Sequence, residues 1–241
     1  MGACDSGPVV ETGSMNLERA SDHYRIFVAL AVPDVVRDAI AQVQMRIRRA
    51  LPEGAIRWTR PEQFHLTLKF LGNVETPRLG SLVESLRAAC SCIMPLHLRL
   101  RGIGAFPTWR RPRVIWVSIE SLHGGLPQLE RAVEAACSEF APAKPSRSYD
   151  KVVCDLGRPI EETHNDGPVT EETAGHVTLG RIKKITRSQA VGLEESASLA
   201  SPGVAGEWNA GQVEIMRSRL TPHGAQYTLV ADIPLPNQAA R

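Results

Sequence analysis

Strand-like runs alternate with helix-like segments along this chain, and several of the runs lie too close together for a parallel crossover. Runs rich in β-branched and apolar residues occur at 25–30, 64–71, 96–103, 114–119, 176–182, 213–220 and 226–233. Apolar residues recur at helical spacing in segments that follow Pro33, Pro77 and Gly125. A parallel connection needs about a dozen residues or more, whereas only a short turn at 221–224 separates the last two runs. The pattern predicts an α+β fold with antiparallel or mixed sheets.

Two stretches of the chain lack such a pattern. Residues 1–22 are polar and aperiodic, which predicts a flexible N-terminal tail before a domain over 23–241. Between 141 and 174 hydrophobic periodicity lapses and acidic residues gather among glycines and prolines. A loop of this length is typical either of a disordered insertion or of an active-site lid, and both alternatives stay open.

Composition restricts the classes of protein to which the chain can belong. Hydrophobic residues make up 43% of it, enough for a substantial core, but there is no apolar run of about 18 residues. The five cysteines lack the paired spacing of a zinc site or of a secreted disulfide framework. We therefore expect a cytoplasmic protein without a membrane partner, and the net charge of +2 permits a phosphate-bearing ligand without requiring one.

One short motif, His-x-Thr-Leu, occurs twice in strand-like runs, at His65–Leu68 and His176–Leu179. Because side chains alternate between the faces of a strand, the histidine and threonine of each motif should share one face. Two such strands that face each other would bring together His65, Thr67, His176 and Thr178.

Two imidazoles and two hydroxyls are suited to phosphoryl chemistry. Imidazole titrates near neutral pH, so a neutral ring can accept a proton while a protonated ring donates one to a leaving oxygen. Threonine hydroxyls can donate hydrogen bonds to phosphate oxygens. We therefore predict that His65 and His176 are catalytic, that Thr67 and Thr178 bind the substrate phosphate, and that no metal or other cofactor is needed.

A single His-x-Thr strand is usually structural, so the prediction depends on the repetition. By average residue usage the four-residue motif should occur twice in only about one chain of this length in a thousand. Zinc binding by the pair is disfavoured because no further ligands lie at metal-binding spacing nearby.

The sequence resembles the bacterial and archaeal RNA 2′,3′-cyclic phosphodiesterases, also called 2′-5′ RNA ligase-like proteins, of the two-histidine phosphoesterase superfamily. Besides the two motifs, the resemblance is carried by Trp58 and by the segments 25–30, 61–72, 111–117 and 218–222 with Gly224 and Tyr227. It extends over nearly the whole chain from about residue 24. The chain departs from the family pattern at Gly175, where proline is usual, and in the length of the 141–174 segment.

The resemblance implies a two-lobed α+β fold, with mostly antiparallel sheets, outer helices and a central cleft that carries both motifs. It also implies hydrolysis of RNA 2′,3′-cyclic phosphate ends to 2′-phosphomonoesters, with His65 as proton donor and His176 as acceptor. The expected partners are RNA ends or nucleotides bearing a 2′,3′-cyclic phosphate, and the expected state is a monomer. Reverse ligation through a 2′-5′ linkage and a non-catalytic nucleotide-binding module are the alternatives.

Further residues are weaker candidates for contact with substrate. Arg181 follows the second motif and either binds phosphate or forms a surface ion pair. Lys69 shares a face with His65 and Thr67 if alternation continues. Aromatic residues that either stack on a base or pack in the protein are Trp58, Phe106, Trp109 and Tyr227. Arg110, Arg111 and Arg113 form a loop that either contacts RNA backbone or is simply solvated.

Overall fold

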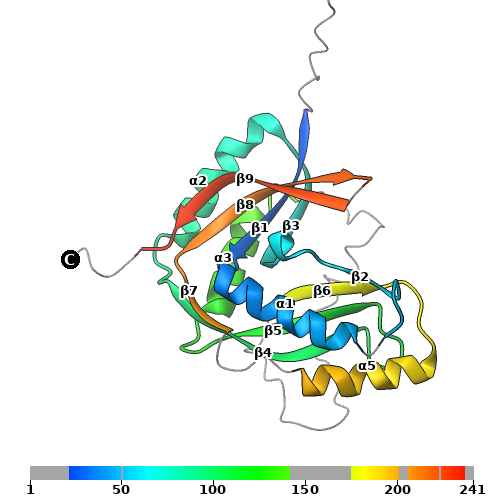
Figure 1. Ribbon diagram of the computed structural model, residues 1–241. Coiled ribbons are helices and arrows are strands. Elements are labelled where there is room, and N and C mark those ends of the chain that lie inside the picture. Colours follow the sequence, from blue (N-terminus) through cyan, green and yellow to red (C-terminus); the bar gives the residue numbers. More distant parts are fainter. Residues whose placement is uncertain (1–21, 50, 142–174, 201–205, 223, 237–241) are drawn as a thin grey trace, which may run out of the picture.

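The structure is a computed structural model, and it describes residues 22–49, 51–141, 175–200, 206–222 and 224–236. Most of the predicted tail and nearly all of the 141–174 segment therefore lie outside the described residues, and both predictions stay open. Within the described ranges the strands form two sheets (Figure 1).

The first sheet has the strand order β3-β1-β8-β9 and the second the order β2-β6-β5-β4-β7. The first sheet contains β1 (His23–Ala31), β3 (His65–Glu75), β8 (Gln212–Thr221) and β9 (Gly224–Pro234). The second contains β2 (Ile56–Trp58), β4 (Leu96–Phe106), β5 (Val114–Ser121), β6 (Gly175–Ile182) and β7 (Glu207–Ala210). Every neighbouring pair in both sheets is antiparallel, which confirms the antiparallel prediction.

Four helices pack around the sheets in the described part of the chain: α1 (Asp34–Arg48), α2 (Leu79–Cys90), α3 (Leu126–Cys137) and α5 (Arg187–Leu199). Helices α2 and α3 contact each other and the first sheet, whereas α5 contacts α1 and strand β4 of the second. In α1 the buried residues are spaced by three or four positions, as the sequence predicts, and include Val36, Ile40, Val43 and Ile47. The chain crosses between the two sheets several times, so neither lobe is a continuous segment.

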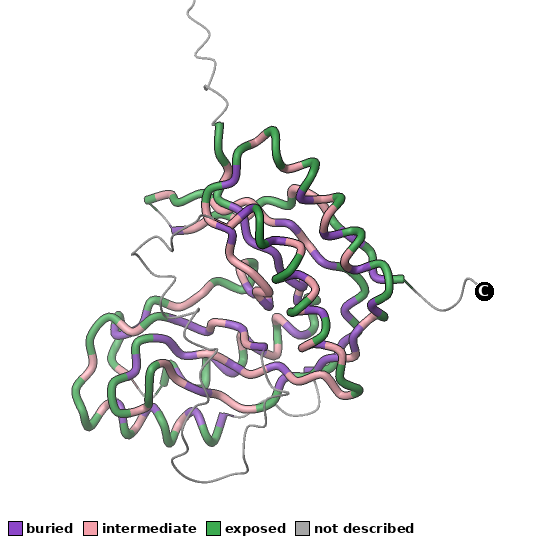
Figure 2. Tube along the Cα trace, turned by 180° about the vertical axis from the view of Figure 1, so that it is seen from behind, coloured by how far each residue is buried: buried purple, intermediate pink, exposed green. Residues whose placement is uncertain are grey.

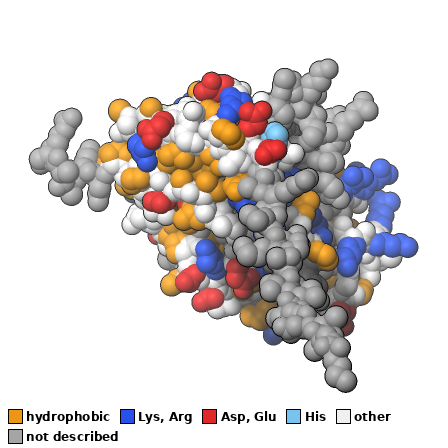
Figure 3. Space-filling view, turned by 90° about the horizontal axis from the view of Figure 1, so that it is seen from above, with side chains coloured by type: hydrophobic (Ala, Val, Ile, Leu, Met, Phe, Trp, Pro, Cys, Tyr) orange, Lys and Arg blue, Asp and Glu red, His pale blue; other side chains and the backbone are white. Residues whose placement is uncertain are grey.

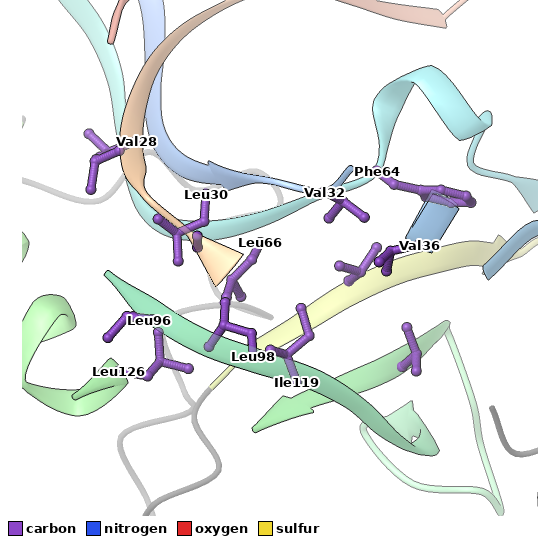
Figure 4. Packing of buried hydrophobic residues seen from close by; sticks show 14 of the residues in the cluster. Val28, Leu30, Val32, Val36, Phe64, Leu66, Leu96, Leu98, Ile119 and Leu126 are labelled. Atoms are coloured by element: carbon purple, nitrogen blue, oxygen red, sulfur yellow. The ribbon is translucent and has the colours of Figure 1, made fainter. Parts of the chain in front are cut away.

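The core is continuous between the two lobes. Buried residues lie along the inner strands of both sheets, while loops and outer helix faces are exposed (Figure 2). Leu66 of β3 lies between Leu30 of β1 and the side chains of Leu98 and Ile119 from the second sheet (Figure 4). The middle residue of the first His-x-Thr motif is thus part of the contact that joins the lobes.

Three elements are absent from the sequence prediction. Strands β2 and β7 are three and four residues long, too short for alternation to identify them. Helix α5 has small buried residues, Ala190 and Ala197, on either side of Leu193, so its apolar face is weak in the sequence. The start of α5 could have been identified from the sequence, because Thr186 and Gln189 have the spacing of a capping box. In the structure each of these side chains accepts a hydrogen bond from the other residue's backbone N–H.

Candidate active site

The two His-x-Thr motifs lie on strands β3 and β6, one from each sheet, and these strands contact each other. Gly175, directly before His176, is part of that contact: a Cβ atom there would lie 3.1 Å from the side chains of Leu66 and Leu126. The absence of a side chain at 175 therefore lets the two strands approach closely. Gly175 also has the backbone N–H that the family's usual proline lacks, and it lies opposite Ile119 of β5.

A β-bulge follows each motif at its leucine. The residues on either side of Leu68 face consecutive residues of β1, and those on either side of Leu179 face consecutive residues of β5. Each leucine is the extra residue of its strand, so the alternation of side chains is inverted beyond it. The two halves of the site thus share a local geometry as well as a sequence.

The bulge at Leu68 makes the expectation for Lys69 wrong. Lys69 lies opposite Val28, whose side chain belongs to the core, and its Nζ lies 2.5 Å from Oε1 of Glu134 on α3. The side chain therefore points to the helix side of the sheet and not to the face of His65. The bulge at Leu179 has the opposite effect on Arg181. Simple alternation would place the Arg181 side chain on the face away from His176, whereas the inverted alternation places it on the same face as His176.

His65 has a defined hydrogen-bond partner. Its Nδ1 lies 2.7 Å from the carbonyl oxygen of Gln63, and since a carbonyl only accepts, Nδ1 carries the proton. In the neutral ring Nε2 is then the free acceptor. The ring also packs against Phe27, with centroids 4.7 Å apart, and stands edge-on to Tyr227 at 5.2 Å.

His176 is surrounded in a similar way by aromatic residues of the second sheet. Its ring centroid lies 5.5 Å from that of Phe106 and 5.9 Å from that of Trp116, and these two residues stack on each other. Trp116 in turn lies over Gly104, where any Cβ atom would collide with the indole. The indole Nε1 is buried and has no hydrogen-bond partner among the described residues.

Burial sets the protonation state of both imidazoles. Removal from water lowers the pKa of His65 to about 4, although the hydrogen bond to Gln63 acts in the opposite direction. Removal from water also lowers the pKa of His176 to about 4, and the charge of His65 adds to the effect. The two rings are therefore close enough to interact, and in the unliganded protein both are neutral at pH 7.

The other predicted site residues lie near the imidazoles. Thr67 and Thr178 are half-buried, and neither hydroxyl makes a hydrogen bond to another described residue. Burial raises the pKa of Tyr227, and the charges of Arg181 and Arg25 oppose that rise. Arg181 of the second sheet is thus near Tyr227 of the first, on the side of the imidazoles.

The remaining aromatic candidates divide into two groups. Phe106 and Tyr227 contact the motif histidines, as described above. Trp58 and Trp109 instead pack against the hydrophobic core, and the guanidinium of Arg48 lies 5.3 Å from the Trp58 ring centroid. The structure thus favours the packing alternative for these two tryptophans.

Several residues that support the site were not among the sequence candidates. Gln63 orients His65 through its carbonyl, and its side chain donates a hydrogen bond to the carbonyl of Ala225 in β9 at 2.6 Å. Gln44 is buried in α1, and its Nε2 donates to the carbonyls of Thr59 and Leu179 at 2.9 and 2.7 Å. Gln44 could have been identified from the sequence, because a glutamine on the apolar face of α1 needs a buried hydrogen-bond partner. For Phe27 and Trp116 the contacts depend on pairing between distant strands.

Metal-ligating side chains do not gather in groups of three or more within the described ranges. Metal-independent chemistry stays a prediction. None of the helices in those ranges is long and apolar enough to span a membrane.

The fold matches solved phosphoesterase structures over most of their length. TT0787 of Thermus thermophilus is 25% identical, with a TM-score of 0.60, and the match covers 89% of this chain and 99% of that one. LigT of E. coli, solved without ligand and in complex with 3′-AMP, matches with a TM-score of 0.59 at 20% and 21% identity over 90% and 89% of this chain. The lobed α+β arrangement is therefore that of the LigT fold.

Sequence comparison leads to the same family. The family described as LigT like Phosphoesterase matches residues 30–116, which include the first motif. Curated relatives named RNA 2′,3′-cyclic phosphodiesterase are 27% identical in Methanothermobacter thermautotrophicus, over 85% of this chain and 95% of the relative, and 25% identical in Methanocaldococcus jannaschii, over 86% and 99%. The chain is thus similar to the LigT-like phosphoesterases in sequence and in fold.

Proposed function

We propose that this protein hydrolyses the 2′,3′-cyclic phosphate at the end of an RNA to a 2′-phosphomonoester, with His65 as general acid and His176 as general base. The observation that carries the proposal is the proximity of the two motif imidazoles, which come from different sheets and interact electrostatically. The relatives that share the full length of the domain carry the name of this activity, which supports the choice of substrate.

The reaction needs one proton acceptor and one proton donor. Water attacks phosphorus as His176 accepts its proton, the bond from phosphorus to O3′ breaks, and Nε2 of His65 gives a proton to O3′. The product has a 2′-phosphate and a free 3′-hydroxyl. Thr67, Thr178 and Arg181 donate hydrogen bonds to the non-bridging oxygens, whose charge increases as the pentavalent state forms.

The surroundings of the two rings support this division of roles. The carbonyl of Gln63 stabilises a positive charge on His65, because it accepts a hydrogen bond from Nδ1 in either protonation state. His176 has no such acceptor among the described residues, and a charge on His65 further disfavours a charge on His176. When the pair holds a single proton, His65 is therefore the better donor and His176 the better acceptor.

The test is turnover of an oligoribonucleotide that ends in a 2′,3′-cyclic phosphate, in the presence of a chelator, with the product identified by chromatography. We expect a 2′-phosphomonoester, and we expect His65→Ala and His176→Ala each to lower kcat by about 10²-fold or more. His123→Ala changes an exposed histidine before α3 and is the matched control. A folded His65→Ala variant with full activity would exclude the assignment, as would nucleotide binding without turnover or activity that returns only on addition of zinc.

A further inference from the structure

An open groove with a volume of about 1480 Å³ lies where the second sheet meets the start of α5. One wall is the loop between β4 and β5, which contributes Arg110, Arg111 and Arg113. The connection from β6 into α5 also lines the groove and contributes Lys183, Lys184 and Arg187. Arg57 of β2 and Arg181 of β6 complete the basic residues, and none of the described residues that line the groove is an aspartate or glutamate.

Counterions distinguish several surface cations elsewhere from the lysines and the loop arginines of the groove. Elsewhere in the described part of the chain Arg37, Arg87 and Arg99 each form an ion pair with a nearby carboxylate. None of the lining lysines, and none of the loop arginines, pairs with a described carboxylate. Like charges held this close are unfavourable unless an anion binds between them. The groove therefore has the electrostatics of a site for a polyanion.

Arg181 connects the groove with the candidate active site. Arg181 lines the groove, lies five residues beyond His176 on the same strand, and is near Tyr227, whose ring contacts His65. Arg57 lies opposite Arg181 in the pairing of β2 with β6. At about 3.3 Å per residue, the strand from His176 to its end covers about 20 Å before Lys183. In Figure 3, Lys and Arg side chains gather at the right-hand edge, the side where β6 leads into α5 in Figure 1.

We propose that this groove binds the phosphodiester backbone of the RNA strand whose 3′ end occupies the candidate active site. The inference rests on the proposed function for the identity of the strand, and it adds that the substrate is an RNA of several nucleotides rather than a mononucleotide. Lysine and arginine contacts to backbone phosphates are independent of base sequence and sensitive to salt. The groove thus selects substrates by length and charge.

The test compares Lys183→Gln/Lys184→Gln with Arg87→Gln/Arg131→Gln, a control that removes two positive charges from α2 and α3. The substrates are an RNA of about ten nucleotides with a 2′,3′-cyclic phosphate end, and a nucleoside 2′,3′-cyclic monophosphate. We expect the groove variant to raise KM for the oligonucleotide by about tenfold with kcat unchanged, and to leave kcat/KM for the mononucleotide within about twofold. Its plot of log kcat/KM against log salt should be shallower by about 1.4, since each single-strand phosphate contact contributes about 0.7.

A binding measurement separates this inference from the proposed function. Fluorescence anisotropy with a labelled RNA of about ten nucleotides that ends in a 3′-phosphate requires no turnover. Weaker binding by the groove variant than by the control supports the groove even if no hydrolysis occurs. Hydrolysis that is independent of RNA length and of Lys183 and Lys184 would overturn the groove while the chemistry stands, and equally tight binding of poly-glutamate would overturn RNA as the occupant.

Discussion

The hydrogen bond from Nδ1 of His65 to the carbonyl of Gln63 determines which nitrogen faces the reaction. Because the carbonyl cannot donate, the neutral ring presents its lone pair at Nε2, and the protonated ring presents a donor at the same atom. The same nitrogen can therefore donate a proton and take one back in the next turnover. No comparable hydrogen bond to a described residue fixes the tautomer of His176.

The low pKa values lead to a prediction for the pH dependence of the rate. The proposed mechanism needs one neutral and one protonated ring, but in the free protein burial lowers the pKa of each to about 4. Above pH 4 the singly protonated form therefore becomes scarcer by about tenfold per pH unit, so kcat/KM should decline from an acidic optimum. Bound phosphate carries negative charge and raises both values, so the decline in kcat should occur at least about one pH unit higher.

The measurement is a pair of pH profiles for kcat and kcat/KM on the same substrate. The structure thus moves the expected optimum for kcat/KM to the acidic side of neutrality, although the unperturbed pKa of imidazole alone would place it near pH 6.5. Profiles that are flat from about pH 5 to 9, with chemistry rate-limiting, would exclude the two-imidazole mechanism.

At the scale of elements, the geometry of β6 depends on a helix from another part of the chain. The side chain of Gln44 in α1 bonds the carbonyls of Thr59 and Leu179, and Leu179 is the bulge residue directly after Thr178. Gln44 therefore stabilises the point at which β6 reverses its alternation.

Replacing Gln44 tests the importance of this contact. Gln44→Met keeps the length of the side chain but removes the donor to both carbonyls, and the carbonyl of Leu179 keeps only the N–H of Thr59. We therefore expect the free energy of unfolding to fall by about 1–3 kcal/mol. Gln42→Met changes an exposed position of the same helix and should have an effect within about 0.5 kcal/mol. Chemical denaturation of both variants measures the difference, and equal stabilities would show that the contact with Leu179 is dispensable.

At the scale of the whole molecule, the histidines link stability to pH. The pKa of each ring is about 4 in the native protein and about 6.5 in the unfolded chain, so the unfolded chain binds more protons between these pH values. Their contribution to the free energy of unfolding is therefore complete above about pH 6.5 and is lost as the pH falls towards 4. Because the side chains are only half-buried, we expect about 1–2 kcal/mol for each ring.

The prediction concerns the loss of stability on acidification. The double variant His65→Gln/His176→Gln should lose less thermal stability than the wild type between pH 7 and about pH 4.5, with a difference in Tm of about 5 °C. The corresponding change at His97 and His123, both outside the candidate active site, is the control. Scanning calorimetry at the two pH values measures the effect, and parallel losses in all three proteins would contradict the low pKa values.

Much of the fold could be predicted from the sequence because its signals are local. Alternation and helical spacing identified seven of the strands and the helices α1, α2 and α3. The repeated His-x-Thr-Leu motif identified two histidines that interact in the structure, and short connections predicted antiparallel or mixed sheets. These features depend on neighbouring residues of the chain, so the sequence contains them directly.

Only the tertiary structure decided which way the side chains beyond each motif point. A β-bulge arises when a strand and its partner differ in register, and that difference involves residues far apart in the sequence. For this reason alternation was wrong for Lys69, and it could not bring Arg181 to the imidazoles. Folding likewise buries the two imidazoles, which lowers their pKa values. It also forms the basic groove, which Lys183, Lys184 and Arg187 line together with the loop at 110–113. The sequence by itself determined which chemical groups the protein carries, and the pairing of the strands determined which of them act together, because burial and charge interactions depend on distance in space.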